Sequence, residues 1–203
     1  GIELQDRLGQ AAGMGRSNGS AVLKGDFLYH GDRAGWVYKR EYKPATASFD
    51  IVERKRVGIE VQAVEVADID GVERVLVGSQ RGLTVLDQNL GFVAELTDYG
   101  DVRSIAVADG FGTTQDVIIC QALQVRLLVV RLNGSALTVE HFQDIGWLTD
   151  ILVNENAGAA DDVYFAMSQG HVVKMELQGA APSYNLVCVA CSDYTNGTPA
   201  NLE

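Results

Sequence analysis

The feature that most constrains the fold is a segment that occurs four times in the chain. Each copy begins at an acidic residue, continues through a short apolar run, turns at polar or small residues and resumes as a second apolar run. The copies are Asp26-FLYHGDRAGWVYKRE, Glu73-RVLVGSQRGLTVLDQN, Asp116-VIICQALQVRLLVVRLN and Asp162-VYFAMSQGHVVKMELQ. Their acidic residues are 47, 43 and 46 positions apart, which is a spacing typical of repeat proteins.

Each repeat is expected to contain four β-strands. The paired apolar runs have the length of strands and are rich in Val, Ile, Leu and Tyr, as strands are. Another apolar run precedes the copies at Val61-QAVEVADIDG, Val102-RSIAVADGFG and Trp147-LTDILVNENAG, and a more variable one follows, as in Gly91-FVAELTD and Leu137-TVEHFQD. Antiparallel four-stranded units at this period predict an all-β protein, a β-propeller of about four four-stranded blades.

Two runs support this prediction over other folds. Val75-Leu76-Val77 and Val117-Ile118-Ile119 are continuously apolar, which indicates sheets that are buried on both faces. A β-sandwich needs no similarity at a long period, so the four aligned copies count against it. A parallel α/β fold is disfavoured because no long segment has helical periodicity with caps.

The repeats are expected to occupy residues 20–192, as units 20–60, 61–101, 102–146 and 147–192. A flexible glycine-rich lead-in is expected at residues 1–19 and a tail at residues 193–203. Propellers usually have more than four blades. The four units therefore form either a small ring or part of a larger propeller, whose further blades come from another chain or from the rest of the same protein.

Charge restricts the classes of partner. The chain has 27 acidic and 16 basic side chains and a formal net charge of -11, so nucleic acid and anionic membranes are disfavoured. One basic group could bind phosphate, but a solvated strand and loop face explains it more simply. It comprises Lys39, Arg40, Lys43, Arg54, Lys55 and Arg56.

No apolar run is long enough to suggest a membrane span, so a soluble protein is expected, either cytoplasmic or extracellular. The odd count of 3 cysteines argues against a disulfide-built scaffold. Cys188 and Cys191 form C-V-A-C without a second pair to complete a zinc site. In a regular strand these two side chains would project to opposite faces.

The segments VADIDG and VERVLVGS together resemble the FG-GAP or VCBS repeats of integrin-type propellers, and VLVGSQRGLTVLD is similar to quinoprotein and WD40-like propeller repeats. The resemblance covers residues 20–190 and implies the propeller fold. Because FG-GAP repeats often carry a calcium loop, it also implies Asp68 and Asp70 as Ca²⁺ ligands. Where the further acidic ligands of such a loop would be expected, the chain goes directly to Val72 and Glu73. The alternative role for the acidic turns is to tie blade edges by hydrogen bonds.

No nucleophile, metalloprotease, P-loop or dinucleotide motif occurs in the sequence, so an enzyme is not expected. The first hypothesis is a non-enzymatic scaffold for protein–protein interaction, with contacts at Arg33, Trp36, Tyr38 and Trp147. Packing between blades is the alternative role for each of these four residues. The second hypothesis is an extracellular adhesion or ligand-binding propeller assisted by calcium. An enzyme with its site at the central funnel is the third.

Overall fold

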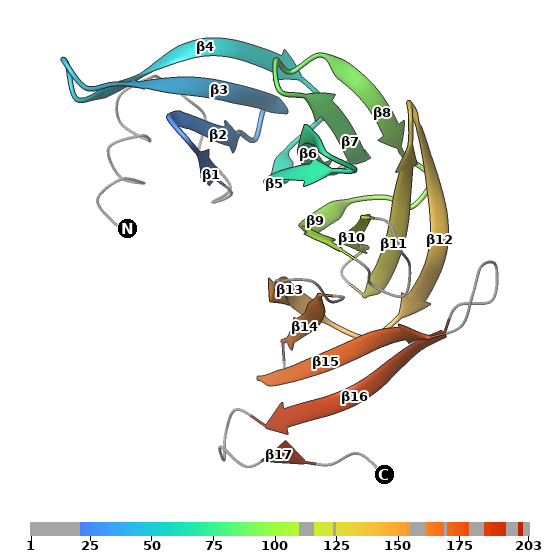
Figure 1. Ribbon diagram of the computed structural model, residues 1–203. Coiled ribbons are helices and arrows are strands. Elements are labelled where there is room, and N and C mark those ends of the chain that lie inside the picture. The colour runs from blue at the N-terminus through green and yellow to red at the C-terminus, as the bar shows by residue number, and fades with distance from the viewer. Residues whose placement is uncertain are drawn as a thin grey trace. The chain divides into compact units, whose positions relative to one another are not determined.

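The computed structural model describes residues 21–109, 116–123, 125–154, 161–168, 170–178, 185–193 and 199–200. Within these ranges the chain forms four antiparallel sheets, and the strands of each sheet follow one another along the sequence (Figure 1). The expected fold class is confirmed. Three sheets have the expected four strands, whereas the fourth has a fifth strand at residues 199–200, within the expected tail. In the described ranges, no helix has the length and apolar character that a membrane crossing requires. The expected lead-in at residues 1–19 lies outside the described residues.

Each sheet corresponds to one repeat. The first contains β1 (Ala21–Lys24), β2 (Phe27–Gly31), β3 (Trp36–Lys43) and β4 (Ser48–Arg56). The second contains β5 (Val61–Ile69), β6 (Val72–Ser79), β7 (Gly82–Asp87) and β8 (Phe92–Leu96). The third contains β9 (Val102–Ala108), β10 (Val117–Ala122), β11 (Arg126–Asn133) and β12 (Ala136–Asp144). The fourth contains β13 (Leu148–Asn154), β14 (Asp162–Met167), β15 (His171–Gln178), β16 (Asn185–Asp193) and the short β17 (Pro199–Ala200).

The chain divides into two compact units. The first unit consists of Gly1–Asp68 and Glu73–Arg103, and the second of Ile69–Val72 and Ser104–Glu203. The core of the first unit is formed by buried aromatic and aliphatic side chains of the first two sheets, among them Tyr29, Val37 and Leu86. The core of the second unit is formed by the last two sheets and includes Phe165 and Ile119.

Burial differs between the sheets. In the third sheet all residues of β10 are buried, and in the second sheet the run Val75 to Val77 is completely buried. The expectation from the continuous apolar runs is therefore confirmed for these strands. In the fourth sheet only alternate residues of β14, Val163 and Phe165, are buried, so this sheet has one covered and one partly open face.

The prediction that Cys188 and Cys191 occupy opposite faces assumed a regular strand. It does not hold, because the strand is irregular between them. A register shift between Lys174 and Met175 makes Cys188 pair with Met175 and Cys191 with Val173. The partners of the two cysteines are thus two residues apart on β15, which places the two positions on the same side of the sheet. The extra residue of the bulge cancels the alternation of a regular strand.

Candidate functional site

Asp32 organises the turn between β2 and β3. Its two carboxylate oxygens accept hydrogen bonds from the backbone N–H of Trp36 at 2.9 Å and from the hydroxyl of Tyr38 at 3.0 Å. Gly35 has a φ of +84°, a left-handed conformation that favours glycine. The structure thus brings Trp36 and Tyr38 together around one carboxylate, with Arg33 exposed on the same turn.

Tyr38 is buried, so the structure favours the packing role for this residue. Its ring stacks on His30 with centroids 4.9 Å apart, and His30 Nε2 accepts a hydrogen bond of 2.9 Å from Arg40 Nε. Burial, followed by the neighbouring Arg40 charge, lowers the pKa of His30 to about 4. Burial and the hydrogen bond to Asp32 raise the pKa of Tyr38.

The basic group identified in the sequence separates into two parts. Lys39 and Arg40 are buried, so the expectation of a solvated face is wrong for these two residues. Lys39 Nζ donates to the carbonyl of Gln88 at 2.8 Å and lies 4.2 Å from the ring centroid of Phe27. Lys43 ends β3 and pairs with Glu41. β4, in contrast, is exposed from residue 50 onward, and its last three residues are the cations Arg54, Lys55 and Arg56.

The linker between β4 and β5, residues 57–60, is held by backbone hydrogen bonds on both sides. The N–H of Val57 donates to the carbonyl of Gly35 and the N–H of Val61 to that of Asp32, both at 2.9 Å. On the other side, the N–H of Gln80 donates to the carbonyl of Ile59 at 3.2 Å. A Cβ on Gly35 would lie 2.0 Å from the carbonyl oxygen of Gly58, so the first hairpin turn contacts the linker directly.

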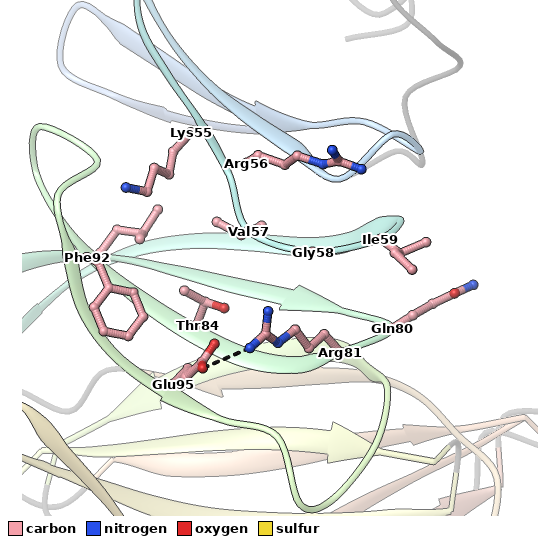
Figure 2. Close-up of a pocket in the computed structure, with 11 residues that line it drawn as sticks. Lys55, Arg56, Val57, Gly58, Ile59, Gln80, Arg81, Thr84, Phe92 and Glu95 are labelled. Atoms are coloured by element: carbon pink, nitrogen blue, oxygen red, sulfur yellow. Dashed lines mark hydrogen bonds and ion pairs between the residues drawn. The ribbon is translucent and has the colours of Figure 1, made fainter.

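A cleft of about 760 Å³ opens along this linker. The eleven residues around it are Lys55, Arg56, Val57, Gly58, Ile59, Gln80, Arg81, Thr84, Leu86, Phe92 and Glu95. In Figure 2 the two β4 cations lie above the linker, and Arg81 forms an ion pair with Glu95 below it. All of these residues belong to the first unit.

The floor and the rim of the cleft differ in chemistry. Leu86 and Val57 are buried, whereas Ile59 and Phe92 are 63% and 57% exposed and present apolar surface to solvent. The charged residues of the lining, which we call the rim, are three cations and one carboxylate. They are Lys55, Arg56, Arg81 and Glu95. The cleft can therefore bind an apolar group and a negative charge at the same time.

The turn between β6 and β7 positions Arg81. Ser79 Oγ accepts a hydrogen bond of 3.1 Å from the Arg81 N–H. Gly82 has a φ of +137°, and a Cβ there would lie 2.1 Å from the carbonyl oxygen of Leu96. Glycine at this position therefore permits the close approach of β7 to the end of β8, and with it the ion pair between Arg81 and Glu95, which spans 3.0 Å.

The Asp68 side chain and the Asp70 backbone have protein partners in the structure. Asp68 forms an ion pair with Lys24 at 3.9 Å. The N–H of Asp70 donates to the carboxylate of Asp116 at 2.6 Å, and the N–H of Asp109 similarly donates to Asp161 at 2.8 Å. These bonds agree with the alternative role of acidic turns. Among the described residues no group of three or more His, Cys, Asp and Glu side chains is arranged to hold a metal ion. Calcium binding through Asp68 and Asp70 stays a prediction.

Trp147 lies in the second unit, directly before β13. It is 60% exposed, and its carbonyl accepts a hydrogen bond of 2.8 Å from the N–H of Ser168. Sequence reasoning singled out this residue and the first hairpin, but it missed Ile59, Phe92 and Arg81 of the cleft. The sequence contained one signal for the cleft, the basic residues Lys55 and Arg56. Their exposure at the end of β4 is seen only in the structure.

The strand order and antiparallel pairing within the four sheets agree with the blades of a β-propeller. The solved structure of Saccharomyces cerevisiae Sqt1, a WD40 propeller, is similar to this chain with a TM-score of 0.60 and 10% sequence identity. The match covers 88% of this chain and 51% of the Sqt1 chain. This chain therefore spans about half the length of that protein, and the likeness shows the fold.

Comparison of the sequence with protein-family models finds no match. Comparison with curated proteins finds no similar sequence either.

Proposed function

We propose that this chain is a non-enzymatic, protein-binding propeller module and that the cleft of the first unit is its binding site. The observation that carries the proposal is the pair of exposed apolar side chains, Ile59 and Phe92, beside a cationic rim. Large apolar side chains surrounded by polar groups mark interaction surfaces. Arg33 and Trp36 lie on the hairpin that is hydrogen-bonded to the same linker, which makes them contacts at the edge of this site.

Phe92→Asp is expected to abolish binding at the cleft, because it places a charge where the partner would bury an apolar group. The measurement is selection of peptides from a random display library on the wild-type chain, followed by titration of the selected peptides against each variant. Phe142→Asp is the matched control, since Phe142 is 54% exposed in the second unit. The proposal fails if no peptide is selected, or if selected peptides bind the Phe92 variant as well as the wild type.

A second contact surface is proposed at the partly open face of the fourth sheet. Leu152 on β13 is 52% exposed and pairs with the half-buried Tyr164. Ala166 and Val172 are paired on the neighbouring strands and are also half-buried. Propeller sheets bury both faces between neighbouring blades, and the match spans only 51% of Sqt1. A further blade, from another chain or from the same protein, would cover this face.

The 203-residue chain is accordingly expected to self-associate through this face, and Leu152→Asp is expected to reduce the association. Light scattering after size-exclusion chromatography should give a mass above the 21.9 kDa of one chain for the wild type and a lower mass for the variant. Leu123→Asp changes another exposed leucine of the second unit and should leave the mass unchanged. A wild-type mass of one chain would refute this prediction.

A further inference from the structure

Among the described residues, the cleft of the first unit is a cationic site on an acidic protein. The residues that line it include the cations Lys55, Arg56 and Arg81, with Glu95 as the one carboxylate, which leaves two positive charges in excess. The whole chain has a formal net charge of -11. A negatively charged ligand would be repelled by most of the protein and attracted at the cleft, so charge would direct it to this position.

Two of the three cations lack a carboxylate partner in the part of the chain that the structure describes. The described ion pairs include Arg81 with Glu95 at 3.0 Å, but none of them involves Lys55 or Arg56. Both residues are on the exposed end of β4, at the edge of the first sheet. They are therefore available to a ligand, and binding would not first have to break an ion pair.

Arg81, the third cation of the lining, is already paired with a carboxylate of the protein. Arg81 Nη2 donates to a carboxylate oxygen of Glu95 at the side of the cleft, so a carboxylate is the one anionic group already bound there. Lysine and arginine at surface sites form charge-assisted hydrogen bonds with such groups. A second and third carboxylate, supplied by a ligand, would complete the pairing of Lys55 and Arg56.

The apolar part of the cleft favours an anionic ligand that also has an apolar side chain. Ile59 and Phe92 are largely exposed, and Leu86 and Val57 are buried residues of the same lining. A ligand that binds only through charge would leave this apolar surface in water. A ligand with a bulky apolar side chain between acidic ones would cover it and gain the free energy of burial.

We propose that the cleft binds a protein segment in which Asp or Glu residues flank a large aliphatic or aromatic residue. The carboxylates would pair with Lys55 and Arg56, and the apolar side chain would lie against Ile59 and Phe92. This inference rests on the proposed function, because it names the chemistry of the partner that the cleft binds.

The test uses two synthetic peptides besides the selected ones. The first alternates Glu with a central Leu-Phe pair, and the second is identical except that every Glu is Gln. We expect the acidic peptide to bind the wild-type chain at least about tenfold more tightly than the neutral one, by an amount that falls as salt increases. Peptides selected from the random library are expected to be enriched in Asp and Glu around an apolar residue.

Reversal of charge at the cleft is the second part of the test. The double variant Lys55→Glu with Arg56→Glu is expected to lose about tenfold or more in affinity for the acidic peptide. Lys24→Glu with Lys43→Glu is the matched control, since it makes the same change in net charge on the same sheet at residues that do not line the cleft. The control is expected to bind nearly as well as the wild type.

Three results would overturn the inference. The first is an equal loss of affinity in the two double variants, which would show a general effect of net charge. The second is binding of a phosphoserine version of the peptide much more tightly than the glutamate version, which would make phosphate the ligand group. The third is selection of neutral or basic peptides that depend on Phe92. In that case the proposed protein-binding function would stand and the acidic partner would not.

Discussion

Phe165→Ala is expected to lower the free energy of unfolding of the second unit by about 3–5 kcal/mol. Phe165 lies on β14, is completely buried and packs in the core cluster of the last two sheets. Its removal would forfeit the burial of an aromatic ring and leave a cavity that neighbours such as Val163 and Ile119 fill only in part. The measurement is urea unfolding followed by circular dichroism, with amide hydrogen exchange to assign the loss to the second unit.

Phe92→Ala is the matched control, because the same atoms are removed from a side chain that is largely exposed. Its effect on the free energy of unfolding should stay below about 1 kcal/mol. The comparison also helps to interpret the binding experiments. A Phe92 variant that loses peptide binding but keeps its free energy of unfolding has lost a contact with the peptide and not its fold. Equal destabilisation by the two variants would contradict the placement of Phe165 in the core.

The strands could be predicted from the sequence because their signal is local and repeated. Each acidic residue of the repeat lies close to the start of a second strand, as Asp26 does before β2 and Asp116 before β10. The tight turn at Asp70 and Gly71 has positive φ at both residues, which is the conformation that an Asp-Gly pair favours in a hairpin. Turn chemistry and apolar runs therefore define the four-stranded units without tertiary information.

The cleft could not be predicted in this way. Its cations at Lys55 and Arg56 come from one repeat, whereas Arg81 and Phe92 come from the next. Periodicity indicates which residues form strands, but it does not indicate which side chains of different sheets meet. The linker that brings them together is placed by backbone hydrogen bonds from Val57 and Gln80, for which the sequence has no pattern.

Position within the sheet also explains the error about the basic group. Lys39 and Arg40 are on β3, which has β2 on one side and β4 on the other, whereas Lys55 and Arg56 are on β4, the last strand of the sheet. A strand with two neighbours buries charged side chains where partners exist, and Arg40 has His30 and the carbonyl of Phe49 as partners. An edge strand leaves its cations in solvent.

Lowering the pH from about 7 to about 4.5 is expected to remove about 2.5 kcal/mol of stability through His30 alone. His30 is 4% exposed, and its pKa in the folded protein is about 4 because of burial and the Arg40 charge. In the unfolded chain the pKa of histidine is about 6.5. Between these two values the unfolded state binds a proton that the folded state does not, so stability falls as the pH is lowered through this range.

His30→Gln provides the comparison, because the glutamine oxygen can accept the hydrogen bond from Arg40 Nε but does not titrate in this range. The variant is expected to be less stable than the wild type at pH 7, since it loses the ring that stacks on Tyr38. Its further loss on acidification should be smaller than that of the wild type by about 2.5 kcal/mol. Urea unfolding at both pH values measures this difference, in which the contributions of all other titrating groups cancel. NMR titration of the His30 ring gives the pKa directly, and a midpoint near 6.5 would show that the ring is not held neutral by burial and Arg40.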